Sequence, residues 1–151
     1  MPPSFPDRER TLGSLLRQVY HALQERTYAA LAQRGFHDLR AAHSVVFRHI
    51  EPDGSRVTDL AALAGMTKQS MSYLIDGLCS VGYVRIAPDP ADGRAKLAQL
   101  TARGREATKA LIELSAQFER ELARLIGAAR MKQLRALLEQ AAGSLRADPA
   151  D

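Results

Sequence analysis

Polar side chains able to contact nucleic-acid bases share one face of the helix that the sequence predicts over residues 67–82. On a helical wheel of 100° per residue, Gln69 and Tyr73 lie opposite Met71, and Ser72 lies beside them. The amide of Gln69 can make two hydrogen bonds to an adenine, and the hydroxyls of Ser72 and Tyr73 can reach bases or phosphates. This face is therefore a candidate surface for reading base edges in a groove of DNA.

The N-terminus of the same helix offers a second kind of contact. Backbone N–H groups at a helix N-terminus favour binding of a phosphate. The residues that we expect to contact phosphate there are Thr67, which also caps the helix, Lys68 and Ser70. The helix could thus contact both the bases and the backbone of one duplex.

The opposite face of this helix is apolar and needs a core to pack against. Leu74, Ile75 and Leu78 lie within about 60° of Met71 on the wheel. Gly82 ends the helix. This narrow stripe predicts that only one side of the helix is buried.

A shorter helix precedes this one. Thr58 is its expected N-cap, and Gly65 suits the left-handed residue that ends it. Two helices joined by a short turn that contains glycine form the helix-turn-helix pattern. We therefore expect the second helix of this pair to be the one that enters the major groove.

The residues after Gly82 predict a β-hairpin. Residues 83–86 alternate in polarity and are rich in strand formers, residues 97–100 can pair with them, and Asp92-Gly93 is the expected turn. Arg94 and Lys96 then lie near the tip, where they can contact phosphates or the minor groove. A hairpin that follows a helix-turn-helix is a wing.

The positive charge of the chain is concentrated in this part of the sequence. The 151 residues contain 21 Lys and Arg against 17 Asp and Glu, a net charge of +4. This excess permits a nucleic-acid partner without demanding one. Residues 67–105, however, hold six Lys and Arg, three Asp and no Glu. A polar helix face can also be simply solvated, so it is the conjunction of turn, polar face, hairpin and basic tip that favours DNA.

Long helices flank this part of the chain. One is predicted to end near Gly35, and a second to begin with Asp38 as its N-cap. Thr101 caps a long C-terminal helix, which Gly127 interrupts. The apolar residues of the C-terminal helices have a heptad-like spacing and need a partner surface, either a second chain or the first helix of the same chain.

The expected fold is all-α with a small β-hairpin wing, a winged helix-turn-helix module flanked by N- and C-terminal dimerisation helices. Its expected parts are a flexible N-terminal tail (1–9), a helical dimerisation region (10–35 and 101–146), a winged helix-turn-helix DNA-binding region (36–100) and a C-terminal tail (147–151).

Over residues 39–104 the sequence resembles the MarR family of transcriptional regulators. The segments that carry the resemblance are residues 57–61, 67–82, 89–95 and 100–104. The resemblance implies a homodimer that presents two winged modules to a pseudopalindromic operator in double-stranded DNA, and a repressor function. It also implies that Arg94 reaches the DNA and that Asp92 orients Arg94 through an ion pair.

Regulators of this type often release DNA when a small aromatic or anionic effector binds between the dimerisation helices and the DNA-binding module. The residues that match this region are Arg17, His21, His43 and Phe47, which form no motif. A lone histidine near an apolar face is more often a structural residue than a ligand contact. These four positions are therefore candidates by location alone.

Other kinds of chemistry have little support in the sequence. Cys79 lies late in the helix of residues 67–82, which favours an inert, partly buried thiol over an oxidant sensor. His37, His43 and His49 are spread around a helix, so no metal site is expected. No nucleophile–base set, acid pair or phosphate-binding glycine loop occurs, and we expect neither an enzyme nor a cofactor. The alternative function is a protein-interaction module that uses the exposed helix.

The sequence also predicts where the protein works. No apolar run approaches the roughly 18–20 residues that span a bilayer, and residues 1–8 contain no signal-peptide core. With a single cysteine, a reducing compartment is the default. We therefore expect a cytoplasmic protein without a membrane partner.

Overall fold

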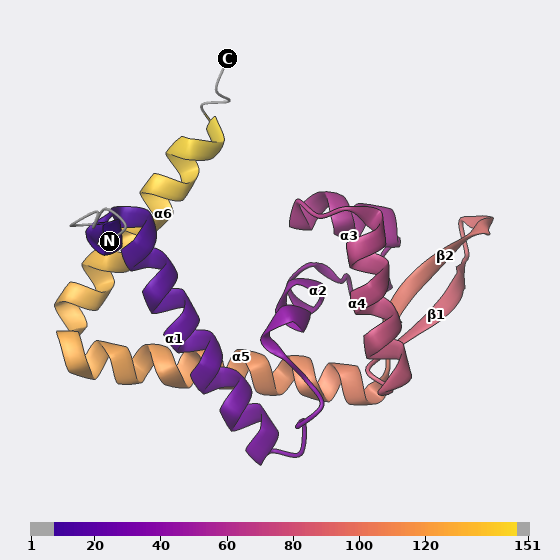
Figure 1. Ribbon diagram of the computed structural model, residues 1–151, viewed down its shortest axis with the longest axis horizontal. Coiled ribbons are helices and arrows are strands. Elements are labelled where there is room, and N and C mark those ends of the chain that lie inside the picture. Colours follow the sequence, from indigo (N-terminus) through magenta and orange to yellow (C-terminus); the bar gives the residue numbers. More distant parts are fainter. Residues whose placement is uncertain (1–7, 148–151) are drawn as a thin grey trace, which may run out of the picture. The chain divides into compact units, whose positions relative to one another are not determined.

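The structure is a computed structural model that describes residues 8–147. It is mostly helical (71%) with a two-stranded antiparallel hairpin, which confirms the expected fold class. The elements in chain order are a 3-10 turn at Arg8–Arg10, α1 (Leu12–Gln33), a 3-10 turn at Ala41–His43, α2 (Ser44–His49), α3 (Val57–Ala64), α4 (Lys68–Ser80), β1 (Val84–Asp89), β2 (Asp92–Leu100), α5 (Ala102–Ile126) and α6 (Ala128–Ala147) (Figure 1). The tails expected at 1–9 and 147–151 lie for the most part outside the described residues.

The chain forms two compact units, Met1–Leu114 and Ser115–Asp151. In the first unit the largest fully buried side chains come from α1 to α4 and from the residue before β1: Leu31, Val46, Leu60, Met71, Ile75, Leu78 and Tyr83. The second unit holds the end of α5 and all of α6, and no residue of α6 is buried. The helix-turn-helix therefore has a core within its own unit.

Asp38 does not cap the second helix as predicted. The chain forms a 3-10 turn from Ala41 and becomes α-helical only at Ser44, where α2 begins. The ring Nδ1 of His43 accepts the N–H of Arg40 at 3.1 Å and takes over part of the capping. The carboxylate of Asp38 is instead used in tertiary hydrogen bonds, and these override its local preference for a cap.

The helix-turn-helix agrees with the prediction except at its first residue. Helix α3 begins at Val57, with Arg56 in the N-cap position, so the predicted cap Thr58 lies inside the helix. Gly65 ends α3 with φ +63°, in the left-handed region as expected. At the start of α4, the Thr67 hydroxyl accepts the N–H of Ser70 at 3.1 Å, which confirms Thr67 as the N-cap.

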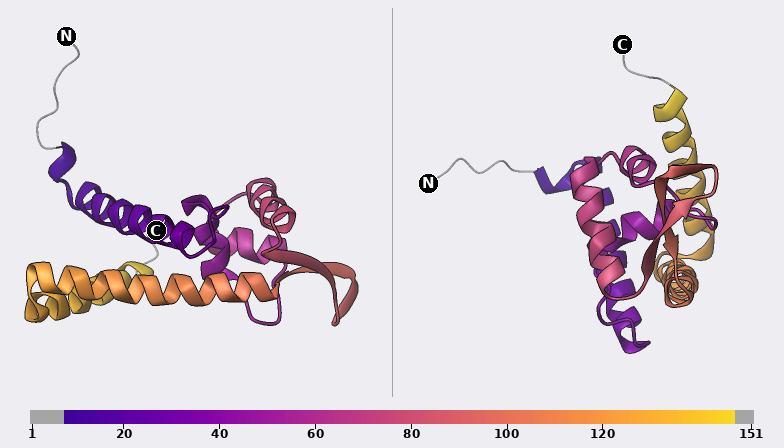
Figure 2. Two further views of the ribbon diagram at one scale, coloured as in Figure 1. Left: turned by 90° about the horizontal axis from the view of Figure 1, so that it is seen from below. Right: turned by 90° about the vertical axis from the view of Figure 1, so that its right-hand side faces the viewer.

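The wing is longer than predicted and turns at a different place. Strands β1 and β2 pair from Val84↔Leu100 to Asp89↔Asp92, so the turn is Pro90-Ala91 and the predicted Asp92-Gly93 turn is wrong. Proline fits the first turn position because its φ is already fixed. The Asp89 carboxylate also accepts the N–H of Ala91 at 2.9 Å, which closes the turn locally. Figure 2 shows the hairpin extending beyond α3 and α4.

The start of α5 is fastened to the base of the wing. The Thr101 hydroxyl accepts the N–H of Gly104 at 3.1 Å and donates to the Gly82 carbonyl at 2.6 Å, so the predicted N-cap is confirmed. A Cβ at Gly104 would lie only 2.1 Å from the Tyr83 carbonyl oxygen. Glycine therefore allows the first turn of α5 to approach the backbone that leads into β1. Gly127, with φ +95°, separates α5 from α6 as predicted.

Candidate nucleic-acid interface

The predicted DNA-facing residues of α4 lie on its solvent side. Tyr73 is 79% exposed, Gln69 and Lys68 are exposed, and Ser72 is half-buried. The opposite side carries Met71, which is fully buried. The buried stripe thus fixes the rotation of the helix so that the polar face points outward.

The first turn of α4 presents its N–H groups without a nearby carboxylate of its own. Thr67 and Ser70 are exposed, and their hydroxyls hydrogen-bond each other at 2.9 Å while Thr67 also accepts the Ser70 N–H. No acidic residue lies in this turn. The positive end of the helix dipole can therefore attract an anion, because no negative charge on the same turn opposes it.

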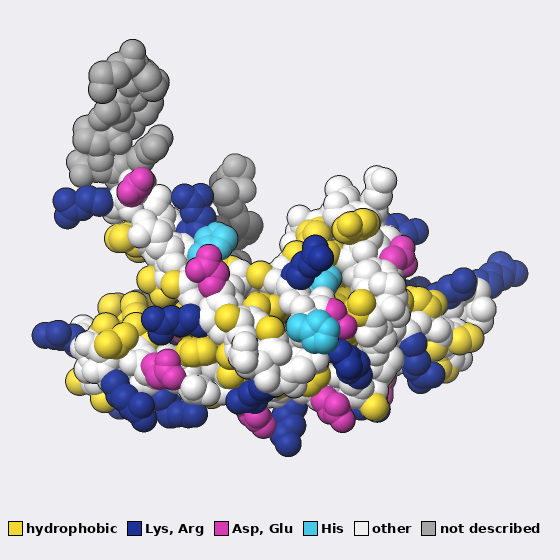
Figure 3. All heavy atoms as spheres, turned by 60° about the horizontal axis from the view of Figure 1, so that its bottom comes forward, with side chains coloured by type: hydrophobic (Ala, Val, Ile, Leu, Met, Phe, Trp, Pro, Cys, Tyr) yellow, Lys and Arg dark blue, Asp and Glu magenta, His cyan; other side chains and the backbone are white. Residues whose placement is uncertain are grey.

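The wing carries exposed positive charge on β2. Lys96 is exposed opposite Pro88, and Arg94 is exposed in the stretch of β2 where the strand register shifts. No carboxylate in residues 8–147 makes an ion pair with Arg94. Figure 3 shows Lys and Arg side chains over the outer part of the hairpin. This end of the molecule is therefore the natural place for a phosphate.

Asp92 has a different partner from the one that the family resemblance implies. Its Oδ1 accepts the backbone N–H of Arg94 at 3.2 Å, and its Oδ2 lies 3.6 Å from Nη2 of Arg56. Asp92 thus shapes the backbone before Arg94, while the guanidinium of Arg94 stays outside the pair. The implied Asp92–Arg94 ion pair is absent from the described residues.

Arg56 is a residue of the interface region that the sequence analysis missed. From the N-cap position of α3 its guanidinium donates two hydrogen bonds to Asp89 Oδ2, at 3.0 Å from Nε and 2.7 Å from Nη2. These bonds, with the N–H of Ala91, hold the pKa of Asp89 below its ordinary value. Nothing in local periodicity signals the pair, because its members lie 33 residues apart.

A second cluster joins the wing base to the loop after α1. The Tyr83 hydroxyl donates to Asp38 Oδ1, and Nη2 of Arg103 lies 3.0 Å from the same hydroxyl. The Arg103 guanidinium also stacks over the Tyr83 ring at 4.8 Å. Burial raises the pKa of Asp38, but the bonds from Tyr83 and Arg103 outweigh it and the pKa is lowered. The cluster thus holds an ionised carboxylate beside a buried tyrosine.

The four candidate effector residues have different surroundings in the single chain. Arg17 and His21 are exposed on α1. His43 is half-buried, and burial lowers the pKa of its ring, which favours the neutral form. Phe47 is buried with its ring centroid 6.4 Å from that of Tyr83. The last two residues are thus structural in the isolated chain.

The structure brings a different polar group together between α1 and α2. Tyr20 Oη accepts from Gln24 Nε2 at 2.8 Å and from Arg48 Nη2 at 2.9 Å. Gln24 Nε2 also donates to Ser44 Oγ at 3.0 Å. The nearby Tyr28 hydroxyl is buried beside Ser44 without a hydrogen bond of good geometry, and its burial raises the pKa of Tyr28 to about 12. A helical step of four residues joins Tyr20, Gln24 and Tyr28, and this signal could have been found in the sequence.

The remaining candidates add no further chemistry. Cys79 is half-buried, and burial followed by the nearby Asp76 raises the pKa of its thiol, which disfavours the reactive thiolate. Among the described residues no group of three His, Cys, Asp or Glu could hold a metal ion. None of the described helices is long and apolar enough to cross a bilayer.

A supporting helix, an exposed polar helix and a basic hairpin, in this order, define a winged helix-turn-helix protein. Residues 37–95 match the model of the MarR family, which confirms the resemblance of the sequence over this part of the chain. The match spans α2 to α4, β1 and the start of β2.

Solved structures of transcriptional regulators are similar over most of the chain. A MarR family protein of Mycobacterium tuberculosis in complex with salicylic acid is 28% identical, with a TM-score of 0.65 over 87% of this chain and 96% of that one. CouR of Rhodococcus jostii bound to p-coumaroyl-CoA is 25% identical, with a TM-score of 0.66 over 87% and 91%. The MepR–DNA complex of S. aureus is 20% identical, with a TM-score of 0.67 over 89% and 98%. No curated protein sequence matches the chain.

Proposed function

We propose that this protein is a homodimeric, sequence-specific DNA-binding regulator that represses transcription and releases its operator when a small effector binds. The observation that carries the proposal is the exposed polar face of α4 next to a wing whose Arg94 has no acidic partner within residues 8–147. A cation without a carboxylate partner can neutralise a phosphate and release its counterions.

The contacts divide by type. Gln69, Ser72 and Tyr73 would read bases from α4, because they lie beyond the first turn on its open face. The residues that would contact phosphates or the minor groove are Thr67, Lys68, Ser70, Arg94 and Lys96. Asp92 would contribute indirectly, by fixing the backbone that precedes Arg94.

DNA binding is tested with duplexes selected from a randomised pool by the wild-type protein. The affinity for the enriched duplex should fall steeply as salt rises. Arg94→Ala should weaken binding to the enriched and to a scrambled duplex alike, and its salt slope should be smaller by about 1, because one phosphate is no longer neutralised. Gln69→Ala should instead narrow the difference between the two duplexes, by about tenfold.

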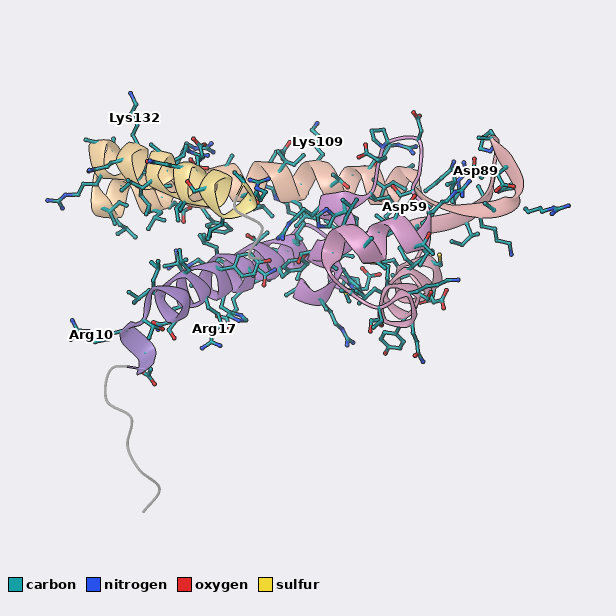
Figure 4. The ribbon with its side chains drawn as sticks, turned by 90° about the horizontal axis from the view of Figure 1, so that it is seen from above. Arg10, Arg17, Asp59, Asp89, Lys109 and Lys132 are labelled. Atoms are coloured by element: carbon teal, nitrogen blue, oxygen red, sulfur yellow. The ribbon has the colours of Figure 1, made fainter. Side chains whose placement is uncertain are left out.

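Lys109→Gln on α5 is the matched control, because it removes one exposed positive charge from a helix outside α4 and the wing (Figure 4). Failure of the pool to enrich any sequence would overturn the proposed function and favour a protein-interaction module. If the salt slope of Lys109→Gln falls as much as that of Arg94→Ala, the effect of Arg94→Ala comes from the net charge of the protein and not from a phosphate contact.

The dimer is proposed from apolar residues that face solvent in the single chain. On α1 these are Leu12, Leu15, Leu16 and Val19, and on α6 they are Leu134, Leu137, Leu138 and Leu145. Exposed apolar residues that share one side of a helix mark an interaction site in a protein. We infer that residues 10–35 and 101–146 form the dimerisation region around the DNA-binding residues 36–100. Light scattering during size-exclusion chromatography should give twice the chain mass of 16.5 kDa.

The effector is proposed to bind beside the polar group of α1 and α2. The buried Tyr28 hydroxyl lies beside Ser44 without a hydrogen bond of good geometry, and the Arg48 guanidinium reaches the same region through Tyr20. A ligand carboxylate or phenol oxygen would satisfy both. Two of the similar proteins were solved with salicylic acid or with p-coumaroyl-CoA, both of which are aromatic and anionic. Arg17, His21, His43 and Phe47 would then surround the site rather than form it.

Salicylic acid serves as the first probe of this site. It should raise the melting temperature of the protein and release the enriched duplex over the same concentration range, because a ligand shifts the equilibrium only by its differential affinity. Tyr28→Phe should weaken both effects, and Lys109→Gln on α5 should weaken neither. Stabilisation without release would place the ligand outside the regulatory mechanism.

A further inference from the structure

Arg56 connects the start of α3 to the outer part of the wing. Its two hydrogen bonds reach Asp89, and the same Nη2 atom lies 3.6 Å from Asp92. Asp89 and Asp92 are the last pair of the hairpin and face each other across the turn. One guanidinium therefore contacts both strands next to the tip. Figure 4 shows Asp89 on the hairpin.

The wing has a second, independent attachment closer to its base. Ser55 pairs with Ala98 of β2 through two backbone hydrogen bonds of 2.9 and 2.8 Å. Gly54 allows this approach, because a Cβ there would lie 2.7 Å from Cγ of Gln99 and 3.1 Å from the Ala98 carbonyl oxygen. Neighbouring residues 55 and 56 thus hold the wing at two levels.

The two levels are separated along the hairpin. Ala98 pairs with Ile86, and Asp89 lies three residues beyond Ile86 toward the turn, about 10 Å at the usual rise of a strand. A hairpin held only at its base can pivot, because a two-stranded ribbon is marginally stable by itself. A second contact nearer the tip removes this pivot.

The contact near the tip is well suited to persist. The Asp89 side chain is 10% exposed and both its oxygens are used, one by Arg56 and one by the N–H of Ala91. The carboxylates that face Arg56 are those of Asp89, Asp92 and, more remotely, Asp59 of α3. The charge of Arg56 is therefore already compensated within the protein, in contrast to that of Arg94.

We propose that Arg56 is a positioning residue, which sets the height of the wing above α4 so that Arg94 and Lys96 meet the DNA backbone while α4 lies in the groove. This inference rests on the proposed DNA-binding function. Arg56 does not itself supply a phosphate contact. It lowers the cost of binding because the wing is ordered before the DNA arrives.

The charges of Arg56 and Asp89 allow a test in which the two explanations predict opposite changes in DNA affinity. Asp89→Asn removes a negative charge from the wing and keeps an oxygen that can accept the N–H of Ala91. If only net charge governed affinity, this variant would bind DNA more tightly. If Arg56 positions the wing through Asp89, the variant binds less tightly although the protein has become more positive.

The experiment compares Arg56→Gln, Asp89→Asn and the double variant with Arg94→Ala, on the enriched duplex at several salt concentrations. We expect each single change of the pair to weaken binding by about tenfold with an unchanged salt slope. The double variant should bind no more weakly than either single variant, as coupled residues do. Arg56→Lys should restore part of the affinity, since lysine keeps the charge but lacks the fork of donors.

Hydrogen exchange of the free protein supplies a readout that needs no DNA. Amides 92–96 should exchange faster in Arg56→Gln than in the wild type, and those of α4 should not. Tighter DNA binding by Asp89→Asn, a salt slope of Arg56→Gln that matches Arg94→Ala, or unchanged wing exchange would each overturn the inference. If the pool enriches no duplex, the proposed function fails, and the exchange measurement alone decides whether Arg56 orders the wing.

Discussion

The winged module and the C-terminal helix α6 distribute their apolar side chains in opposite ways. On α4, Met71, Ile75 and Leu78 are at most 1% exposed. On α6, Leu134, Leu138 and Leu145 are between 37% and 80% exposed although their spacing is just as regular. Amphipathic periodicity therefore predicts a face that will be buried, but it does not identify the surface that buries it.

This difference separates two sources of stability. The winged module completes its core with residues of the same unit, so its stability belongs to one chain. Helix α6 has no buried residue in the single chain, so its stability should depend on association and hence on protein concentration. Substitutions of the same type should consequently have different effects in the two regions.

The largest difference is expected for a glycine-to-alanine exchange. Gly104→Ala would place a Cβ 2.1 Å from the Tyr83 carbonyl oxygen, a clash that only a backbone shift can relieve. Its free energy of unfolding should fall by about 3 kcal/mol, measured by urea denaturation at a fixed protein concentration.

Gly143→Ala on α6 is the matched exchange. Nothing lies within 4 Å of its Cβ position, and alanine is the better helix former. Its stability should rise by up to about 1 kcal/mol. Equal effects of the two exchanges would show that the packing around Gly104 is looser than the structure gives it.

A smaller effect is expected when a charge is placed on the apolar face of α6. Leu138→Glu should raise the dissociation constant of the proposed dimer at least tenfold, because burial of a leucine side chain contributes roughly 1.5–3 kcal/mol. Sedimentation across a range of protein concentrations measures this constant. Gln140→Glu, two residues further and on the side of the helix opposite Leu138, adds the same negative charge and keeps all the leucines. A dimer weakened equally by both variants would contradict the assigned face.

The sequence predicts the elements of the winged module well where the signal is local. The N-caps Thr67 and Thr101, the ends at Gly65 and Gly127, and the buried stripe of α4 all follow from residues within one or two turns. The predicted turn of the wing is wrong because Asp92-Gly93 is a common hairpin turn, whereas the chain turns at Pro90 with its fixed φ.

Residues that act at long range cannot be predicted in this way. Arg56 and Asp89 are 33 residues apart, and Asp38 and Tyr83 are 45 residues apart. Asp38 looks like a helix cap because aspartate has that local preference. Only the fold shows that its carboxylate has been recruited by Tyr83 and Arg103 instead, and the α-helix begins several residues later. The sequence predicts the exposed polar face of α4, but it does not predict the contact that holds the wing beside it.

The smallest expected effect is the loss of stability in Asp38→Asn, and its pH dependence tests the bonds from Tyr83 and Arg103 to Asp38. Burial acts to raise the pKa of Asp38, but the bonds from Tyr83 and Arg103 lower it overall. A carboxyl whose pKa is lower in the folded state stabilises the fold above its unfolded value of about 3.9 and loses that contribution as pH falls through the folded value. Asp38→Asn should therefore be less stable by about 1 kcal/mol at pH 7, and its deficit should shrink below pH 4. Urea denaturation from pH 7 to pH 3 measures the deficit, with Asp53→Asn on an exposed turn as the control. A deficit that stays constant with pH would mean that Asp38 acts through its shape rather than its charge.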